Sequence, residues 1–144
     1  MKKIIAILLA LLLLSTMGLT ACTGETEVIA LEDTPWALES YSEPGDLRAV
    51  LEGSEITALF DSAEGKVNGS AGCNNYFAGY EINDSELSIS NAGSTMMFCG
   101  EPEGVMEQEN QYLSLLVGTK IFQIQDNQLH IFSSGGQKLI FDVQ

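Results

Sequence analysis

The chain has 144 residues, and its 20 acidic against 6 basic residues give a formal net charge of −14 at pH 7. This length is typical of one folded domain, and the acidic balance excludes a nucleic-acid-binding role, which depends on Lys and Arg. Only 18% of the residues are charged and 45% are apolar, so the composition also excludes a disordered acidic tail. The three cysteines, an odd number, cannot all pair within one chain.

Residues 1–21 have the features of a secretory signal peptide. Lys2 and Lys3 provide the positive start, and the apolar stretch 4–14 has the length of a signal core rather than of a membrane-spanning helix. The segment Leu19-Thr20-Ala21-Cys22 then resembles the lipobox of bacterial lipoproteins, in which the cysteine is lipidated before the signal peptidase cuts. The alternative is an ordinary secretory peptide followed by a chance cysteine.

Lipidation of Cys22 predicts an exported protein anchored to the cell membrane, because two or more acyl chains give stable anchoring. If the source has an outer membrane, that membrane is the alternative site of the anchor. All 20 acidic residues follow Cys22, whereas Lys2 and Lys3 leave with the signal, so the mature chain carries −16. Anionic head groups repel such a domain. Residues 22–33 are predicted to be a lipidated tether, and residues 34–144 the folded domain.

Beyond Thr34, most of the sequence consists of short apolar segments with a period of two, separated by turn residues. This pattern predicts an antiparallel meander of seven or eight strands. The expected strands cover residues 36–38, 56–60, 66–69, 77–82, 87–90, 120–125, 129–132 and 138–143. Asn, Asp and Gly residues between several of these segments suit tight hairpins.

One segment, from Pro102 to Val117, has its apolar residues at helical rather than strand spacing. Pro102 suits the first turn of a helix, and Gly118 suits the position just after the last turn. A single amphipathic helix must bury its apolar face. The predicted fold is therefore mainly β, an antiparallel meander forming a curved sheet or barrel, with one helix packed against it or inside it.

Two segments carry a family resemblance: residues 67–80, with the sequence VNGSAGCNNYFAGY, and residues 94–99, with the sequence STMMFC. Together with Trp36-Ala37-Leu38 and the strand around His130, they resemble the META domain, the family that includes the HslJ heat-shock lipoproteins. The resemblance implies a barrel-like β domain and a disulfide between the two later cysteines. It also brings an association with heat shock and novobiocin resistance, but no established biochemical activity.

The cysteine count supports the same disulfide. If Cys22 is lipidated, Cys73 and Cys99 are the only thiols left in an exported compartment, where disulfides persist. The alternative is a reactive or redox-cycling cysteine. The sequence has no Cys-x-x-Cys motif, and its single histidine, His130, lies far along the chain.

Three residues of the first motif are candidate binding residues: Asn74, Tyr76 and Tyr80 would line a ligand-facing edge. The alternative is structural, because Asn side chains bond their own backbone in loops and glycines let a strand bend at a barrel corner. The glycines concerned are Gly69, Gly72 and Gly79.

The other prominent residues are given structural roles. Trp36, Tyr112 and the run Met96-Met97-Phe98 are expected in the core, and His130 on the outer face of its strand. Four glutamates near the start of the helix are expected to face solvent, and they lack the spacing of EF-hand or zinc sites. These are Glu101, Glu103, Glu107 and Glu109.

The leading functional hypothesis is a membrane-anchored envelope lipoprotein, a non-enzymatic accessory or stress-tolerance protein that acts by protein interaction. No catalytic residue, metal or cofactor is predicted, because no motif supplies a nucleophile, a base and an orienting group. The alternative is a β-barrel module that binds a small hydrophobic ligand in its interior. An enzyme is the third hypothesis.

Overall fold

The computed structural model describes residues 29–43 and 46–144. The predicted signal peptide, Cys22 and most of the predicted tether lie outside these residues.

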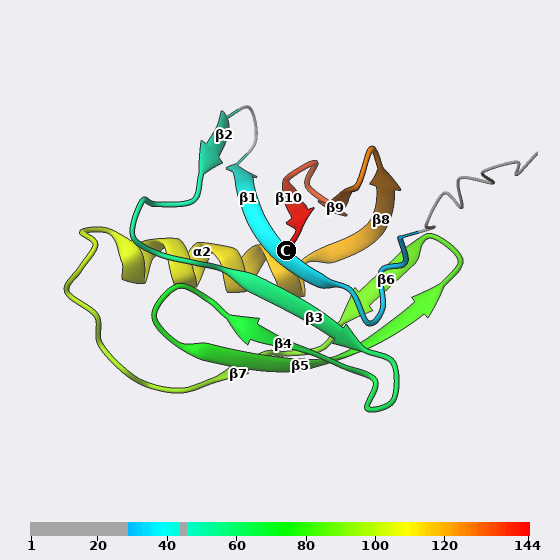
Figure 1. Cartoon of the computed structure of the whole chain (residues 1–144), viewed down its shortest axis with the longest axis horizontal. Coiled ribbons are helices and arrows are strands. Elements are labelled where there is room, and N and C mark those ends of the chain that lie inside the picture. The colour runs from blue at the N-terminus through cyan, green and yellow to red at the C-terminus, as the bar shows by residue number, and fades with distance from the viewer. Residues whose placement is uncertain (1–28, 44–45) are drawn as a thin grey trace, which may run out of the picture.

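The described chain contains ten strands and one helix (Figure 1). The first strands are β1 (Pro35–Glu43), β2 (Asp46–Ala49), β3 (Thr57–Asp61), β4 (Lys66–Ser70), β5 (Asn75–Asn83), β6 (Glu86–Ile89) and β7 (Gly93–Ser94). The helix α2 (Val105–Val117) follows, and β8 (Thr119–Gln125), β9 (Gln128–Ser133) and β10 (Lys138–Val143) complete the chain.

Eight of these strands close into an antiparallel barrel. Their order around it is β1, β3, β4, β5, β6, β8, β9 and β10, and β10 pairs again with β1. The short strands β2 and β7 extend from β1 and β5, respectively. The prediction of a mainly β barrel with one packed helix is confirmed. The two short strands were not predicted, because β2 is exposed throughout and β7 has only two residues.

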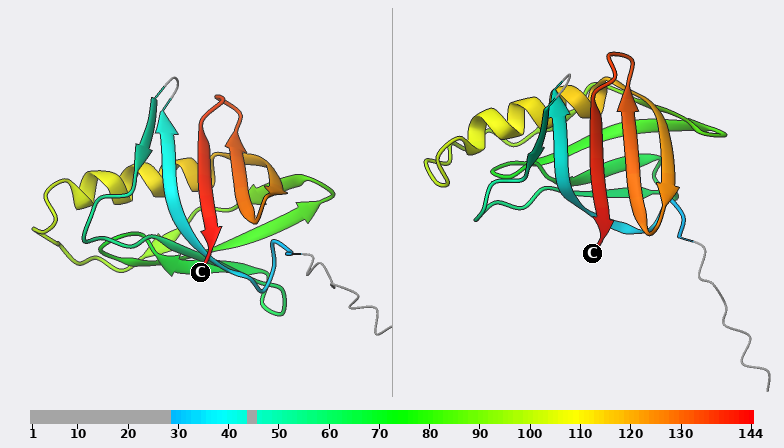
Figure 2. Two further views of the ribbon diagram at one scale, coloured as in Figure 1. Left: turned by 45° about the horizontal axis from the view of Figure 1, so that its top comes forward. Right: turned by 90° about the horizontal axis from the view of Figure 1, so that it is seen from above.

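The two ends of the barrel are covered by different parts of the chain. At one end, α2 runs from the turn between β4 and β5 toward the starts of β8 and β10 (Figure 2). At the other end, residues 29–34 cross the opening. Leu31 is buried there, and its carbonyl oxygen accepts the indole N–H of Trp36 at 2.9 Å. The packed domain thus begins before the predicted boundary at Thr34.

The barrel interior is filled by side chains, as an eight-stranded barrel allows. The Tyr112 side chain enters it from α2, and its ring packs edge to face on Tyr76 and Phe141, at centroid distances of 5.5 and 6.4 Å. The Tyr112 and Tyr76 hydroxyls lie 2.7 Å apart, and the Tyr76 hydroxyl donates to the carbonyl oxygen of Thr57 at 2.9 Å. The helix is therefore joined to the core by both apolar and polar contacts.

Two expectations about burial are wrong. Met96, Met97 and Phe98 do not lie in the core but are 99%, 56% and 86% exposed, because they belong to the loop between β7 and α2. Glu109 does not face solvent but is only 4% exposed. Trp36 and Tyr112 are fully buried, as predicted.

The buried tyrosines predict a loss of stability at alkaline pH. Burial raises the pKa of Tyr76 and of Tyr112 above the ordinary value for tyrosine. The folded state therefore holds these protons more tightly than the unfolded state. Their stabilising effect is present in full below about pH 10 and is lost as the pH rises above that value.

We expect Tyr112→Phe to flatten this alkaline loss, measured as the free energy of unfolding in urea over a pH series. At neutral pH the substitution should cost about 1 kcal/mol, because one buried hydrogen bond is removed. An identical pH dependence in the variant and the native protein would contradict the assignment.

Candidate functional site

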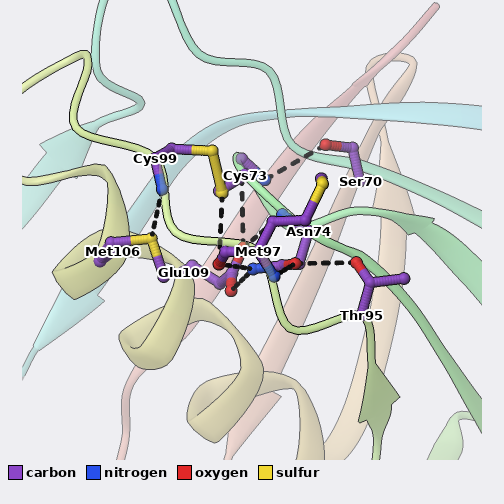
Figure 3. The surroundings of a disulfide bond; sticks show 9 residues. Ser70, Cys73, Asn74, Thr95, Met97, Cys99, Met106 and Glu109 are labelled. Atoms are coloured by element: carbon purple, nitrogen blue, oxygen red, sulfur yellow. Dashed lines mark hydrogen bonds between the residues drawn. A yellow bond between two sulfur atoms is a disulfide. The ribbon is translucent and has the colours of Figure 1, made fainter.

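The predicted disulfide between Cys73 and Cys99 is confirmed, with the two Cα atoms 5.9 Å apart (Figure 3). Cys73 lies in the turn between β4 and β5, and Cys99 in the loop between β7 and α2. The bond joins these segments at the barrel end that α2 covers. The Cys73 sulfur also lies 3.8 Å from the carbonyl oxygen of Met97, a contact without a hydrogen bond because a disulfide sulfur carries no proton.

Asn74, next to the disulfide, is 2% exposed and makes four side-chain hydrogen bonds. Its Nδ2 donates to the carbonyl oxygen of Met97 at 3.1 Å and to Glu109 Oε1 at 2.8 Å. Its Oδ1 accepts the backbone N–H of Met97 at 2.7 Å and the hydroxyl of Thr95 at 2.8 Å. Both amide protons and both lone pairs are therefore used, and both backbone groups of Met97 are fixed.

Glu109 is a buried carboxylate on α2 that is satisfied by N–H groups. Its Oε2 accepts the backbone N–H of Asn74 at 2.7 Å and that of Cys73 at 3.2 Å, in addition to the bond from the Asn74 side chain. Hydrogen bonds from several N–H donors replace the water that a carboxylate loses on burial. Glu109 thus fastens the turn between β4 and β5 to the helix.

A second polar residue of α2, Gln108, holds the loop between β2 and β3. Its Oε1 accepts the backbone N–H of Leu51 at 2.7 Å, and its Nε2 donates to the hydroxyl of Ser54 at 2.8 Å. Gln108 was not singled out from the sequence, but one signal identifies it. It shares with Glu109 the helical spacing that runs from Val105 to Tyr112 on the buried face.

Two glycines allow close contacts around the turn between β4 and β5: Gly72 with α2, and Gly69 with β3. Gly72 has φ +114°, and a Cβ there would lie 3.4 Å from both Val105 and Gln108. A Cβ at Gly69 would lie 2.1 Å from the carbonyl oxygen of Thr57, so a larger residue cannot occupy that position without moving the backbone.

Together these contacts hold the loop between β7 and α2 in one backbone conformation. The Thr95 N–H donates to the carbonyl oxygen of Asn75 at 3.0 Å, and the Cys99 N–H to Met106 Sδ at 3.5 Å. The segment Met96–Phe98, called the apolar loop below, lies between these bonds with its side chains exposed. The site is therefore a rigid loop that presents apolar side chains to solvent.

The three candidate binding residues do not meet at one surface. Asn74 and Tyr76 are both buried near α2, whereas Tyr80 is half-buried, with its hydroxyl donating to Glu32 Oε1 at 2.5 Å. Burial and the bond to Glu32 raise the pKa of Tyr80. A ligand-binding role for these residues stays a prediction, and their contacts favour the structural alternative.

The other candidate residues lie apart from this loop. His130 is half-buried on β9 and stacks on Phe132, with ring centroids 6.4 Å apart. Glu101, Glu103 and Glu107 are exposed, as predicted. In residues 29–43 and 46–144, no three His, Cys, Asp or Glu side chains are placed to bind one metal ion.

A closed antiparallel barrel, covered at one end by a helix and by a loop held with a disulfide, defines the class of protein. The chain belongs to the META domain family, whose model matches residues 29–144. The resemblance carried by residues 67–80 and 94–99 is thereby confirmed. The match begins at residue 29 rather than at residue 34, in agreement with the buried Leu31.

Two solved structures are similar to this chain. An NMR structure of a protein from Burkholderia xenovorans is 31% identical with a TM-score of 0.66, and the match covers 79% of this chain and 83% of that chain. A second NMR structure is 21% identical with a TM-score of 0.59, covers 80% of this chain and 95% of that chain, and shows likeness of fold alone. A comparison with curated proteins finds no match.

Replacing Asn74 should destabilise the protein far more than replacing its neighbour. We expect Asn74→Ala to lower the free energy of unfolding by about 3 kcal/mol, because it leaves buried partners on Glu109 and Met97 without bonds. Asn75→Ala is the matched control, since that side chain is exposed, and should change the value by no more than about 0.5 kcal/mol. Equal losses in urea titrations of the two variants would contradict the role of Asn74.

The disulfide should contribute measurably to stability. For a sequence separation of 26, closing the loop in the unfolded chain is worth about 3.5 kcal/mol. We expect the Cys73→Ser/Cys99→Ser double variant to lose about this much free energy of unfolding relative to the oxidised protein. Thiol titration of the folded, oxidised protein checks the bond itself, and reaction at Cys73 and Cys99 would contradict it.

Proposed function

We propose that this protein is an exported lipoprotein, anchored to a membrane through lipid on Cys22, that acts as a non-enzymatic accessory protein of the cell envelope by binding another protein. The observation that carries the proposal is the apolar loop. Exposed apolar residues that stand together on a protein surface are typical of interaction sites. Here their backbone is fixed by a disulfide and by Asn74.

The anchor is supported by the sequence around Cys22 and by where the folded chain begins. The described chain starts at the barrel end covered by residues 29–34, away from α2 and the apolar loop (Figure 1). A lipid on Cys22 would thus hold the domain by one end and leave the other free. Among the described residues, no helix has the length and apolar character needed to cross a membrane.

The alternative function, a barrel that holds a small hydrophobic ligand, needs free space in the interior. Trp36, Tyr76 and Phe141 from the strands and Tyr112 from α2 are each at most 2% exposed. These side chains occupy the space that such a ligand would need. The packing therefore favours interaction through the outer surface. A role in envelope stress tolerance is part of the proposal and depends on the family resemblance alone.

Lipid anchoring is tested by Cys22→Ser in cells that produce the full chain. We expect the native protein to incorporate a palmitate analogue and to enter the detergent phase on phase partitioning. The variant should lose the label and move to the aqueous phase, because no acyl chains are attached. Labelling or membrane retention that persists in the variant would overturn the anchor.

Action through protein binding is tested with photocrosslinking residues at exposed positions on separate faces of the full chain. Suitable positions are Ala63 in the turn between β3 and β4, Gln123 on β8, and Phe98. At least one position should give an adduct with another envelope protein. The proposed interaction function would be wrong if none does.

A further inference from the structure

The apolar loop has the composition of a contact surface. Met96 and Phe98 are almost fully exposed, and Met97 is more than half exposed. Phenylalanine provides a rigid apolar group at interfaces, and methionine is flexible enough to adapt to a partner's surface. The neighbouring Phe77 on β5 is also 60% exposed, with its ring against Gly93 of β7, which leads into the loop. Phe77 thus adds an exposed apolar side chain beside the strand that leads into the loop.

The loop is also preorganised for binding. Its two ends are held by the disulfide and by the N–H of Thr95, and its centre by the two bonds between Asn74 and the backbone of Met97 (Figure 3). A partner that binds this loop does not have to order its backbone, which removes one of the main costs of association.

The charge around the loop limits what can bind there. The exposed Glu101, Glu103 and Glu107 follow the loop directly, and the whole segment from residue 67 to residue 119 contains no Lys, Arg or His. A second copy of this acidic chain or an anionic bilayer would be repelled. A protein surface with basic residues at its edge would be attracted.

The position of the loop argues against the anchoring membrane as its partner. The described chain begins at one end of the molecule, and the loop between β7 and α2 lies at the opposite end in both views (Figures 1 and 2). With the lipid at Cys22, the described domain would be held from the end opposite this loop, whose apolar side chains are exposed. They are available to a protein domain that approaches from the far side.

We propose that the apolar loop, together with Glu101, Glu103 and Glu107, is the docking surface of this protein. Its partner is a protein with an apolar groove edged by Lys or Arg side chains. The inference rests on the proposed function and adds the surface and the chemistry of the partner. Phe98 is the central anchor, and the glutamates steer the approach of the basic partner.

The test places a photocrosslinking residue at Phe98 in the full chain, in the cells that produce it. Ala63 and Gln123 serve as exposed control positions. We expect at least tenfold more adduct at position 98 than at the controls, with a different protein whose crosslinked peptide contains apolar residues and Lys or Arg. Adducts with a second copy, with lipid, or at equal yield from all positions would overturn the docking surface.

Binding of the purified partner to the full chain is then measured with surface variants. Phe98→Ser and the triple variant Glu101→Lys/Glu103→Lys/Glu107→Lys should each weaken binding at least tenfold. Val143→Ser is the matched control, because it removes an exposed apolar side chain at the other end of the barrel and should leave binding within twofold. Unchanged thermal unfolding shows that each variant is folded, and binding unaffected by Phe98→Ser would overturn the inference.

The outcomes separate the inference from the proposed function. Adducts at Ala63 or Gln123 without one at position 98 would refute the docking surface while leaving the interaction function in place. No adduct at any position would refute both. Binding of the full chain to phosphatidylglycerol or phosphatidylcholine vesicles through Phe98 would replace the protein partner with a membrane.

Discussion

The burial of one carboxylate, Glu109, governs the arrangement of the helix end of this barrel. A carboxylate that leaves water needs a cation or several hydrogen-bond donors, and Glu109 has three N–H donors from Cys73 and Asn74. Since these donors belong to the turn between β4 and β5, the helix can bury Glu109 only when that turn is in place. The same turn orients Asn74, which fixes the backbone of Met97. Helix, turn and apolar loop therefore form one cooperative unit.

The buried face of α2 explains how a polar residue comes to occupy such a position. Its buried residues are Val105, Gln108, Glu109, Tyr112, Leu115 and Leu116, which follow the three- and four-residue spacing of a core-facing helix. The end nearest the barrel axis carries Tyr112 and the leucines, and the end near the disulfide carries Gln108 and Glu109. The C-terminal half of the helix thus packs by apolar contact and by the Tyr112 hydroxyl, whereas Gln108 and Glu109 in its N-terminal half hold loops by hydrogen bonds.

Much of the fold could be predicted from the sequence, because period-two alternation marks strands that have one buried face. The disulfide followed from the family resemblance and from the two cysteines that remain if Cys22 is lipidated. The loop that carries Met96–Phe98 could not be predicted, because an apolar run off a strand or helix has no periodicity to show which side is buried. Glu109 was misjudged because four glutamates near a helix start suit the helix dipole equally well. Its burial depends on Asn74, which is 35 residues away in the sequence.

The two ends of the barrel are closed by different contacts. At the end where the described chain begins, Leu31 and Trp36 are buried and joined by a hydrogen bond, and Glu32 and Asp33 add further hydrogen bonds to the strand ends. The other end is closed by α2 and by the network of Asn74, Glu109 and the disulfide, which lies outside the aromatic core. The interior aromatic contacts of Tyr76, Tyr112 and Phe141 do not involve the cysteines. In the folded state the disulfide acts on the loop, where it helps to fix the backbone beside the exposed Met97 and Phe98, and its contribution to stability comes from constraining the unfolded chain.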